Sequence, residues 1–523
     1  MSSTIQSFYP SNAALLTAEQ TRGVEKRYAN LDLMRRAGKV AADFLIARTT
    51  TDSRMVLFAG PGNNGGDALA CAAELAAAGY APEVVLLGDP DELPVDARAA
   101  WLRVSEWAPP SSSAFARTAG EGACPLSRSA GEGRGEGRSI TVHRTVPSTL
   151  TSADWIVDGL FGIGLKRPLV GVYVDAIRAM AHARDVGASV LALDVPSGID
   201  ADTGALVGDV AVEADHTLTF IARKPGLMTG AALDYVGELH LATLNLDLGG
   251  GAGTVSAFGI ETARARMRPA RANAHKGTHG TLTIVGGANG MLGAVLLASR
   301  AAMRMGAGKV KVAWLADPHP QVDPLMPEVM MRSASDLATD DCTALVVGCG
   351  MGTSGAAVRV LKAQLKRELP MVIDADALNL IAQSADLAAL VQRRKAPTII
   401  TPHPAEAARL LGASTSSVQS DRLRAARDLA KGYNCIAVLK GAGTVVDDGT
   451  ATTINTTGNP LLATAGTGDV LAGMIGALLA QGYAVSDAAR IGVAFHGAAA
   501  DALAARDVKR AVAGDVIAEL AKL

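Results

Sequence analysis

The stretch GNPLLATAGTGDVLAGMIGALLAQG, residues 458–482, decides the fold of the second half of the chain. Glycine and small residues lead to Gly466-Thr467-Gly468-Asp469, and the large apolar residues that follow recur at helical spacing. This pattern predicts a buried helix, and Gly473 and Gly476 beside its apolar stripe allow another element to approach its backbone. Backbone N–H groups and the helix dipole would then create an anion site, with Asp469 placed as a base for phosphoryl transfer.

A family resemblance strengthens this interpretation of the GTGD motif. Taken alone, the motif is also typical of a helix N-cap, and the two interpretations are evenly matched. GTGD followed by VLAG resembles the ribokinase-like superfamily, which implies that Asp469 removes a proton from the hydroxyl being phosphorylated. The whole stretch resembles the ADP-dependent NAD(P)H-hydrate dehydratases. That family often has Gly-Met where this chain has Leu461-Leu462, which leaves the shape of the loop open but not the position of the aspartate.

Length and composition limit the classes of protein. A chain of 523 residues is too long for one core, so we expect two domains. The formal net charge is −2 and no long basic run occurs, which disfavours nucleic acid and anionic membranes as partners. No apolar run approaches the roughly 18 residues of a membrane span, and the first residues do not resemble a signal peptide. The five cysteines lack metal-ligand spacing, so we expect reduced thiols and a cytoplasmic protein.

The order of predicted elements indicates an α/β fold in both halves. Thr17 and Gln20 predict a capping box before a first helix, and a second helix is expected near residues 33–47. Buried strands are then predicted at 55–60, 83–88, 155–164, 189–198, 216–222 and 238–243 in the first half. The second half repeats the alternation, with strands at 280–287, 309–315, 344–350, 371–378, 397–403 and 435–441 and a long helix near 291–306.

We therefore predict a Rossmann-like doubly wound αβα domain over residues 1–245 and a ribokinase-like α/β domain over residues 260–523. Residues 246–259, which include LGGGAG, are expected to form a linker. Residues 108–139 are rich in Ser, Gly, Pro, Arg and Glu and repeat AGEG and GEGR, so we expect a disordered insertion in a surface loop.

Glycine loops and oxygen-bearing side chains follow three predicted strands of the first half. Residues 63–67 (NNGGD) would sit where a doubly wound sheet binds phosphate, but they lack the GxGxxG spacing of a standard dehydrogenase. Asp158, GIGLKRP (162–168) and DVPSG (194–198) would join them at the carboxyl ends of the strands. Alone, NNGGD is also typical of a tight turn, and Asp194 of a residue that caps a turn.

Together these motifs resemble the NAD(P)H-hydrate epimerases, also known as the apolipoprotein A-I-binding protein family. The resemblance implies that Asp194 contacts the hydrated ring as the acid/base residue. It implies a potassium ion held by Asn64, Asp158 and Ser197. It also implies that the substrate is bound by Asn63, Asn64, Gly65, Gly66, Asp67, Gly162, Ile163, Gly164, Leu165, Lys166, Arg167, Pro168 and Asp194. Many members have glycine where this chain has Ala68.

The dehydratase resemblance extends over roughly residues 260–523 and implies further site residues. The hydrate would contact Ala294, Gly352, His403 and Asp469, and His403 is fixed between two prolines. By the residues alone, His403 would more readily be interpreted as a loop histidine. The nucleotide phosphates would be bound by Lys440, Gly441, Ala442, Gly443, Thr444 and Gly468, which do not form a Walker A motif.

The two resemblances imply a bifunctional enzyme that repairs hydrated NADH and NADPH. The first domain would interconvert the R and S hydrates. The second would use ADP, with Mg²⁺, to phosphorylate the S hydrate and release AMP, phosphate and the restored NAD(P)H. We expect a homo-oligomer. The sequence does not determine the number of subunits, whether ADP or ATP is preferred, or whether the hydrate of NADH or of NADPH is preferred. The alternative is a ribokinase-like kinase for a small alcohol or vitamin precursor, with a non-catalytic N-terminal binding module.

Overall fold

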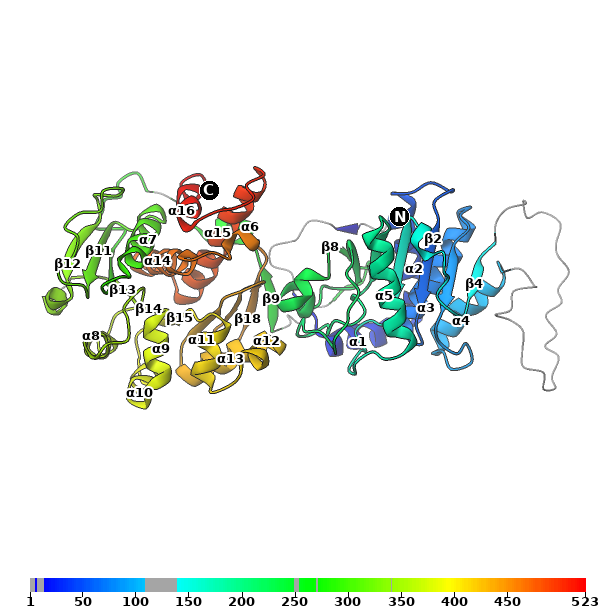
Figure 1. Ribbon diagram of the computed structural model, residues 1–523, viewed down its shortest axis with the longest axis horizontal. Helices are drawn as coiled ribbons and strands as arrows, with labels where there is room; N and C mark the ends of the chain where they lie inside the picture. The colour runs from blue at the N-terminus through cyan, green and yellow to red at the C-terminus, as the bar shows by residue number, and fades with distance from the viewer. Residues whose placement is uncertain (1–4, 7–13, 109–138, 249–253, 270, 340) are drawn as a thin grey trace. The chain divides into compact units, whose positions relative to one another are not determined.

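A computed structural model describes residues 5–6, 14–108, 139–248, 254–269, 271–339 and 341–523. The chain forms two compact units (Figure 1). The first comprises residues 1–8, 15–227 and 231–251, and the second comprises residues 9–14, 228–230 and 252–523. The predicted insertion lies outside the described residues except at its two ends.

The first unit is built on one mostly parallel sheet of eight strands. Their order is β1-β8-β7-β6-β5-β2-β3-β4, and only the β1–β8 pair is antiparallel. The chain runs from β2 outward to β3 and β4 and then returns to β5 on the other side of β2, so the sheet switches direction between β2 and β5. The strands are β1 (Ile5–Gln6), β2 (Met55–Ala59), β3 (Glu83–Leu86), β4 (Thr141–His143), β5 (Trp155–Gly159), β6 (Ser189–Leu193), β7 (His216–Phe220) and β8 (Glu238–Ala242).

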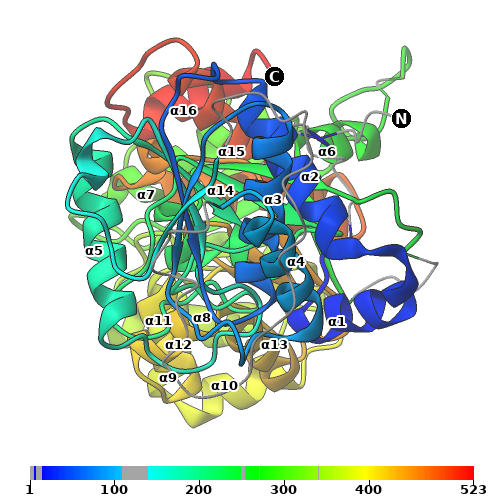
Figure 2. The ribbon, with the colours of Figure 1, turned by 90° about the vertical axis from the view of Figure 1, so that its right-hand side faces the viewer.

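Helices cover both faces of this sheet, as predicted for a doubly wound domain. Figure 2 shows α2, α3 and α4 on one side of the strands and α5 on the other. Separate apolar clusters on the two faces agree with this arrangement, because one contains residues of α2–α4 and the other residues of α5. The helices are α1 (Ala18–Arg27), α2 (Leu33–Ile46), α3 (Asn63–Ala77), α4 (Val95–Ser105) and α5 (Val172–Asp185). The capping box of Thr17 and Gln20 is present at the start of α1.

The second unit contains a ten-stranded sheet with the order β12-β11-β10-β13-β14-β15-β16-β17-β18-β9. In this order, all strands from β12 through β11, β10, β13, β14 and β15 to β16 are parallel to one another. The chain switches direction between β10 and β13. The strands are β9 (Val255–Phe258), β10 (Thr281–Gly286), β11 (Lys309–Trp314), β12 (Met330–Ser333), β13 (Ala344–Val347), β14 (Met371–Ile373), β15 (Thr398–Ile400), β16 (Ile436–Leu439), β17 (Val445–Asp447) and β18 (Thr452–Asn455).

Two layers of helices bury the faces of the second sheet, each with its own apolar cluster. One layer contains α7, α14, α15 and α16, and the other contains α8 to α13. The helices are α6 (Ile260–Arg266), α7 (Leu292–Arg304), α8 (Gly355–Leu365), α9 (Asp376–Gln383), α10 (Ala385–Gln392), α11 (Pro404–Leu411), α12 (Thr415–Ser420), α13 (Arg422–Tyr433), α14 (Thr467–Ala480), α15 (Val485–Ala504) and α16 (Ala513–Leu520).

Helix α14 is the helix predicted from residues 458–482, and it is buried on all sides from Val470 onward. Its glycines explain how it fits. A methyl group at Gly473 would lie 2.0 Å from the carbonyl oxygen of Ala298 on α7, and one at Gly476 would lie 2.4 Å from the side chain of Val346 on β13. The close approach expected beside the apolar stripe is therefore present, with α7 on one side and the sheet on the other.

Several local expectations differ from the structure; the strands expected over 155–164 and 189–198, for example, end at Gly159 and Leu193. Residues 255–258, which we assigned to the linker, form the edge strand β9, because they pair in parallel with β18. Residues 63–67, expected to form a loop, are the first turn of α3. The strand expected over 371–378 ends at Ile373, and α9 begins at Asp376. Each difference arises where glycine or small polar residues give a weak local signal.

Within the described residues, no helix combines the length and the apolar character that crossing a membrane would need.

Candidate functional sites at two strand-end switch points

The first unit has a cavity of about 720 Å³ at the point where its sheet switches direction. Residues that follow β2, β5, β6 and β7 line it, together with residues of α1 and α2. Such a crevice at the carboxyl ends of parallel strands is where doubly wound folds bind ligands. The cavity is lined on the sheet side by Asn63, Asn64, Asp67, Gly162, Ile163, Gly164, Leu165, Asp194, Phe220 and Lys224.

Asp194 follows β6 and is held in one orientation. Its backbone adopts φ 62°, a left-handed conformation that is uncommon for a residue with a side chain and clusters at functional sites. Its Oδ1 atom accepts hydrogen bonds from the Nζ of Lys224, from the hydroxyl of Thr219 at 3.2 Å and from the backbone N–H of Phe220 at 3.3 Å. All three bonds end on Oδ1, which leaves Oδ2 for a ligand in the cavity.

Lys224 and Glu25 were not identified from the sequence. The Nζ of Lys224 is buried and also donates to Thr219 and to the carbonyl oxygen of Phe220, both at 2.9 Å. Burial, followed by the charge of Asp194, raises the pKa of Glu25. Burial and the same aspartate raise the pKa of Asp67 well above its usual range. The site thus combines an anchored Asp194 with two carboxyl groups that retain their protons more readily. Because Glu25 lies on a helix far away in sequence, no local pattern points to it.

Asp158 and Ser197 form an oxygen-rich group beside this cavity. The Oδ1 of Asp158 accepts from the hydroxyl of Ser197 at 2.7 Å, and Oδ2 accepts from the backbone N–H of Ser197 at 2.8 Å. Burial raises the pKa of Asp158 to about 6, and the bonds from Ser197 oppose that rise. Asn64 is buried, and among the described residues its side-chain oxygen and nitrogen have no hydrogen-bond partner. A buried amide oxygen that is left unsatisfied fits an additional oxygen-seeking ligand such as a cation.

The predicted substrate-binding loops are only partly at the cavity. Gly65 and Gly66 do not line it. A methyl group at Gly65 would lie 2.0 Å from the carbonyl oxygen of Gly60, and one at Gly66 would lie 2.4 Å from Met34, so these glycines permit packing of α3. Residues 166–168 also lie outside the lining, and the Nζ of Lys166 pairs with Asp200 at 3.0 Å.

In the second unit, Asp469 lies in the first turn of α14 among groups from neighbouring strand ends. It shares a cluster with Cys349 after β13 and Asp374 after β14, with one ligand atom of each within 4.8 Å of the others. Burial, and next the charge of Asp374, raise the pKa of Asp469 to about 6. Among the described residues, no side chain caps α14. Its N-terminus is therefore available to an anion beside a carboxylate that is mostly ionised at neutral pH.

Lys440, predicted to bind nucleotide phosphate, contacts this cluster directly. Its Nζ lies 2.8 Å from Oδ1 of Asp374, and a methyl group at Gly468 would lie 3.3 Å from the same Nζ. Burial lowers the pKa of Lys440, but the carboxylates of Asp374 and Glu406 outweigh it and raise the pKa overall. The lysine is thus a fixed cation between β16 and the start of α14. In the loop that follows Lys440, the hydroxyl of Thr444 donates a hydrogen bond to the carbonyl oxygen of Gly441 at 3.0 Å.

His403 is the N-cap residue of α11, and its half-exposed imidazole ring lies at the strand ends. Its Nδ1 accepts from the backbone N–H groups of Ala405 and Glu406, while the backbone N–H of His403 donates to Oε2 of Glu406 at 2.8 Å. Burial and the neighbouring Lys440 lower the pKa of His403. The imidazole is therefore neutral at pH 7, with Nδ1 used for capping and Nε2 left to face Glu406 at 3.4 Å or a ligand.

The remaining predicted residues of this site lie around the same strand ends. Ala294 is in the first turn of α7, and its methyl group would be 3.0 Å from one placed at Gly350. The N–H of Gly352 donates to Asp376 at 2.8 Å, which ties the β13 loop to α9. His496 of α15 was not predicted. It is buried, burial lowers its pKa to about 4, and its Nε2 has no hydrogen-bond partner among the described residues.

Comparison with known proteins assigns each half of the chain to a family model. Residues 30–226 match the model described as YjeF-related protein N-terminus, and residues 282–522 match the one described as NAD(P)H-hydrate dehydratase. The bifunctional NAD(P)H-hydrate repair enzyme Nnr of Escherichia coli (strain K12) is 38% identical over 493 residues, which cover 91% of this chain and 85% of that protein. The enzyme of the same name from Coxiella burnetii is 37% identical, with 91% of each chain covered.

Among solved structures, the ADP/ATP-dependent NAD(P)H-hydrate dehydratase of Bacillus subtilis, co-crystallised with ATP/Mg²⁺, is 29% identical. The match covers 50% of this chain and 95% of that chain, with a TM-score of 0.45.

Proposed function

The chain belongs to the family of bifunctional NAD(P)H-hydrate repair enzymes, and from this premise we propose how its two sites share the reaction. The protein is an enzyme with an NAD(P)H-hydrate epimerase activity and an NAD(P)H-hydrate dehydratase activity. We assign epimerisation to the cavity around Asp194 and dehydration to the strand ends around Asp469. One observation carries the second assignment: an ionisable carboxylate lies in the first turn of a helix that no side chain of the described residues caps.

The proposed dehydration begins with phosphorylation of the hydroxyl of the S hydrate. Asp469 accepts the hydroxyl proton, the freed oxygen attacks the terminal phosphorus of ADP, and AMP leaves. The N-terminus of α14 and Lys440 bind the phosphoryl oxygens as negative charge develops on them. The C–O bond then breaks with release of phosphate, and loss of a ring proton restores the dihydronicotinamide. Phosphorylation is needed because hydroxide is a poor leaving group and phosphate is a good one.

Mg²⁺ fits the donors at this site. Lys440 contacts Oδ1 of Asp374, whereas a methyl group at Gly468 would lie 3.9 Å from Oδ2, which therefore faces the start of α14. Carboxylate oxygens together with nucleotide phosphates are the usual ligands of Mg²⁺. We propose that Asp374 holds the ion through Oδ2. The ion would neutralise charge on the phosphates of ADP.

For epimerisation, we propose Asp194 as the acid/base residue. Lys224 orients its carboxylate through Oδ1, and Oδ2 exchanges a proton with the hydrated ring. Glu25 or Asp67, whose raised pKa values favour the protonated form, would supply a proton to the ring hydroxyl. Asn64, Asp158 and Ser197 fit a potassium ion, because the buried side-chain oxygen of Asn64 has no hydrogen-bond partner among the described residues and the paired Asp158 and Ser197 supply further oxygens. We also retain a cytoplasmic location and a homo-oligomer as predictions.

A stereochemical assay tests both activities. Purified protein is incubated with an R/S mixture of hydrated NADPH and ADP, while reduced-nicotinamide absorbance, inorganic phosphate and AMP are followed. We expect complete conversion, with one phosphate and one AMP per NADPH restored. ATP in place of ADP tests the choice of donor. Accumulation of a stable phosphate ester without restored absorbance would instead support the small-alcohol kinase and contradict the proposed dehydration.

A further inference from the structure

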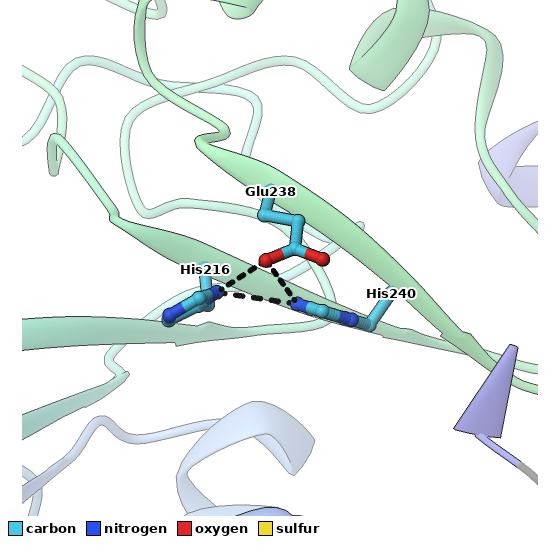
Figure 3. Close-up of side chains that lie close together, drawn as sticks. All are labelled: His216, Glu238 and His240. Carbon is cyan, nitrogen blue, oxygen red and sulfur yellow. Dashed lines mark hydrogen bonds and ion pairs between the residues drawn. The ribbon is translucent and has the colours of Figure 1, made fainter. Parts of the chain in front are cut away.

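Three metal-ligating side chains meet at the start of two adjacent strands of the first unit, away from its cavity. His216 is the first residue of β7 and Glu238 the first of β8, and the strand register pairs them. His240 lies two residues further along β8 and therefore projects from the same face of the sheet. Figure 3 shows the three side chains pointing toward one another.

The distances between the facing atoms match those of a tetrahedral metal site. Nδ1 of His216 lies 3.2 Å from Nε2 of His240 and 3.4 Å from Oε2 of Glu238, and the latter two atoms are 3.6 Å apart. Zinc binds imidazole nitrogen and carboxylate oxygen at about 2.0–2.2 Å, which at the tetrahedral angle places ligand atoms about 3.3 Å apart. An ion at the centre of this triangle would need little movement of the side chains.

Packing holds the two imidazoles in place. His240 is buried, and the rings of Phe44 and Trp155 pack against His216 at centroid distances of 5.5 and 5.8 Å. Nδ1 of His216 and Nε2 of His240 therefore face each other and Oε2 of Glu238, as ligands of one shared ion must.

The charged groups near the three side chains have opposite effects on a bound cation. Arg48 disfavours a cation, whereas Asp215 and Glu238 favour one. Asp215 is already engaged by Arg184 at 3.0 Å and by the backbone N–H of Val190 at 2.9 Å, so Glu238 is the carboxylate that can move onto an ion. The side chain of Glu238 is 58% exposed, which gives an ion access from solvent and room for a water as the fourth ligand.

We propose that His216, Glu238 and His240 form a binding site for a divalent transition metal of the zinc class. Two imidazoles and one carboxylate favour such a metal over Mg²⁺ or Ca²⁺, which prefer oxygen ligands. The site lies at the amino ends of β7 and β8, whereas Asp194 and Phe220 mark the carboxyl ends where the substrate cavity lies. The metal would link two strands and stabilise the first unit without entering the chemistry.

The expected affinity is moderate. Nδ1 of His240 has no hydrogen-bond partner among the described residues, so no hydrogen bond in this part of the chain orients the ring from its far side. The loss of such a partner typically weakens metal binding by 10–100-fold. We therefore expect a dissociation constant for Zn²⁺ of roughly micromolar order rather than the much tighter binding of structural zinc sites.

The test uses the tag-free, metal-stripped full-length chain. Zn²⁺ is titrated against a chromophoric chelator, and Co²⁺ is added separately to detect the visible absorption of a tetrahedral cobalt centre. The variants are His216→Gln and Glu238→Gln, with His182→Gln on α5 as a matched control, because His182 is exposed in the same unit. We expect one Zn²⁺ per chain, weakened at least tenfold in His216→Gln and Glu238→Gln and unchanged in His182→Gln. At a hundredfold excess over Kd, the first unit should melt roughly 5–10 °C higher.

Several outcomes would overturn the proposal. These are the absence of saturable Zn²⁺ binding, equal binding by all variants, or a Co²⁺ spectrum without tetrahedral character. If His216→Gln does not fold, Glu238→Gln decides the question, because Glu238 is exposed and its replacement leaves no cavity. Loss of binding in His182→Gln alone would place the metal elsewhere and also contradict the proposal.

Discussion

At the scale of single residues, the two proposed catalytic aspartates reach their roles through different surroundings. Asp194 is anchored through one carboxylate oxygen by the buried Lys224. For Asp469, burial and the charge of the neighbouring Asp374 together raise the pKa to about 6. That value is low enough for an ionised base at pH 7 and high enough for efficient proton acceptance.

Replacing Asp469 by Asn should abolish most dehydration. The amide keeps the shape of the carboxylate but cannot accept the proton of the hydroxyl, so we expect turnover to fall by about two to four orders of magnitude. ADP binding and epimerase activity should persist, because neither depends on this carboxylate. Since burial disfavours an ionised carboxylate there, the melting temperature should not fall. Near-normal dehydration by this variant would remove Asp469 as the base.

The raised pKa of Asp469 also predicts the pH dependence of dehydration. The base acts in its ionised form, which predominates above a pKa of about 6 and becomes protonated below it. The kcat/KM for dehydration should therefore be nearly constant from pH 7 to 8 and fall about tenfold per unit well below pH 6. Rates are measured against an enzyme-free sample at each pH, because the hydrate also reacts spontaneously. A profile that stays flat down to pH 5 would contradict the role of Asp469.

At the scale of elements, the flanks of the predicted insertion are already joined. The backbone N–H of Ile140 donates to the carbonyl oxygen of Trp107 at 3.1 Å, directly before β4 pairs with β3. The chain between them can therefore be shortened without separating α4 from β4. Strand β4 is the edge strand of the sheet and is separated from β2 by β3, whereas Asp96 at the start of α4 lines the cavity at the switch between β2 and β5.

Deleting residues 110–138 should leave both activities and the melting temperature nearly unchanged. The reason is that a low-complexity loop contributes little buried apolar area, and a shorter loop costs less entropy to close. Circular dichroism during heating and the two activity assays measure the effect. If epimerisation were lost while the protein remained folded, the segment would have a function at the substrate cavity.

At the scale of the whole molecule, the boundary between the units decides which fragments fold. Strand β9 belongs to the sheet of the second unit, where it pairs with β18. A fragment of residues 260–523 lacks this edge strand, whereas one of residues 252–523 retains it. We expect the longer fragment to melt at a higher temperature, and we use it to separate the activities.

Residues 252–523 alone should dehydrate the S hydrate and then stall near the fraction of that epimer present, apart from slow spontaneous epimerisation. Adding residues 1–251 should restart the reaction, because only the first unit interconverts the epimers. The full-length Asp194→Asn variant provides a matched control and should stall in the same way. Equal consumption of both epimers by the second fragment would remove the reason for an epimerase in the first unit.

How much of the site could be predicted depends on how far apart in the sequence the interacting residues lie. Strand ends, glycine loops and the α14 helix are encoded within a few adjacent residues, so the sequence predicted Asp194, Asp158, His403 and Asp469 at the carboxyl edges of two sheets. The same short range misled the interpretation of residues 63–67. They were expected to form a loop but are the first turn of α3, in whose packing Gly65 and Gly66 make room for Gly60 and Met34, while their role in ligand binding stays a prediction.

The sequence by itself determined the α/β class, the two-domain organisation and the family, because each is carried by local periodicity and by contiguous motifs. Only the tertiary structure decided which distant side chains meet. Lys224 is placed on Asp194, Lys440 on Asp374, and His216 beside His240 by strand register and chain crossovers. The assignment of β9 to the second sheet has the same origin. No local pattern encodes these pairings, because a partner across a sheet is selected by the packing of the whole layer and not by its neighbours in sequence.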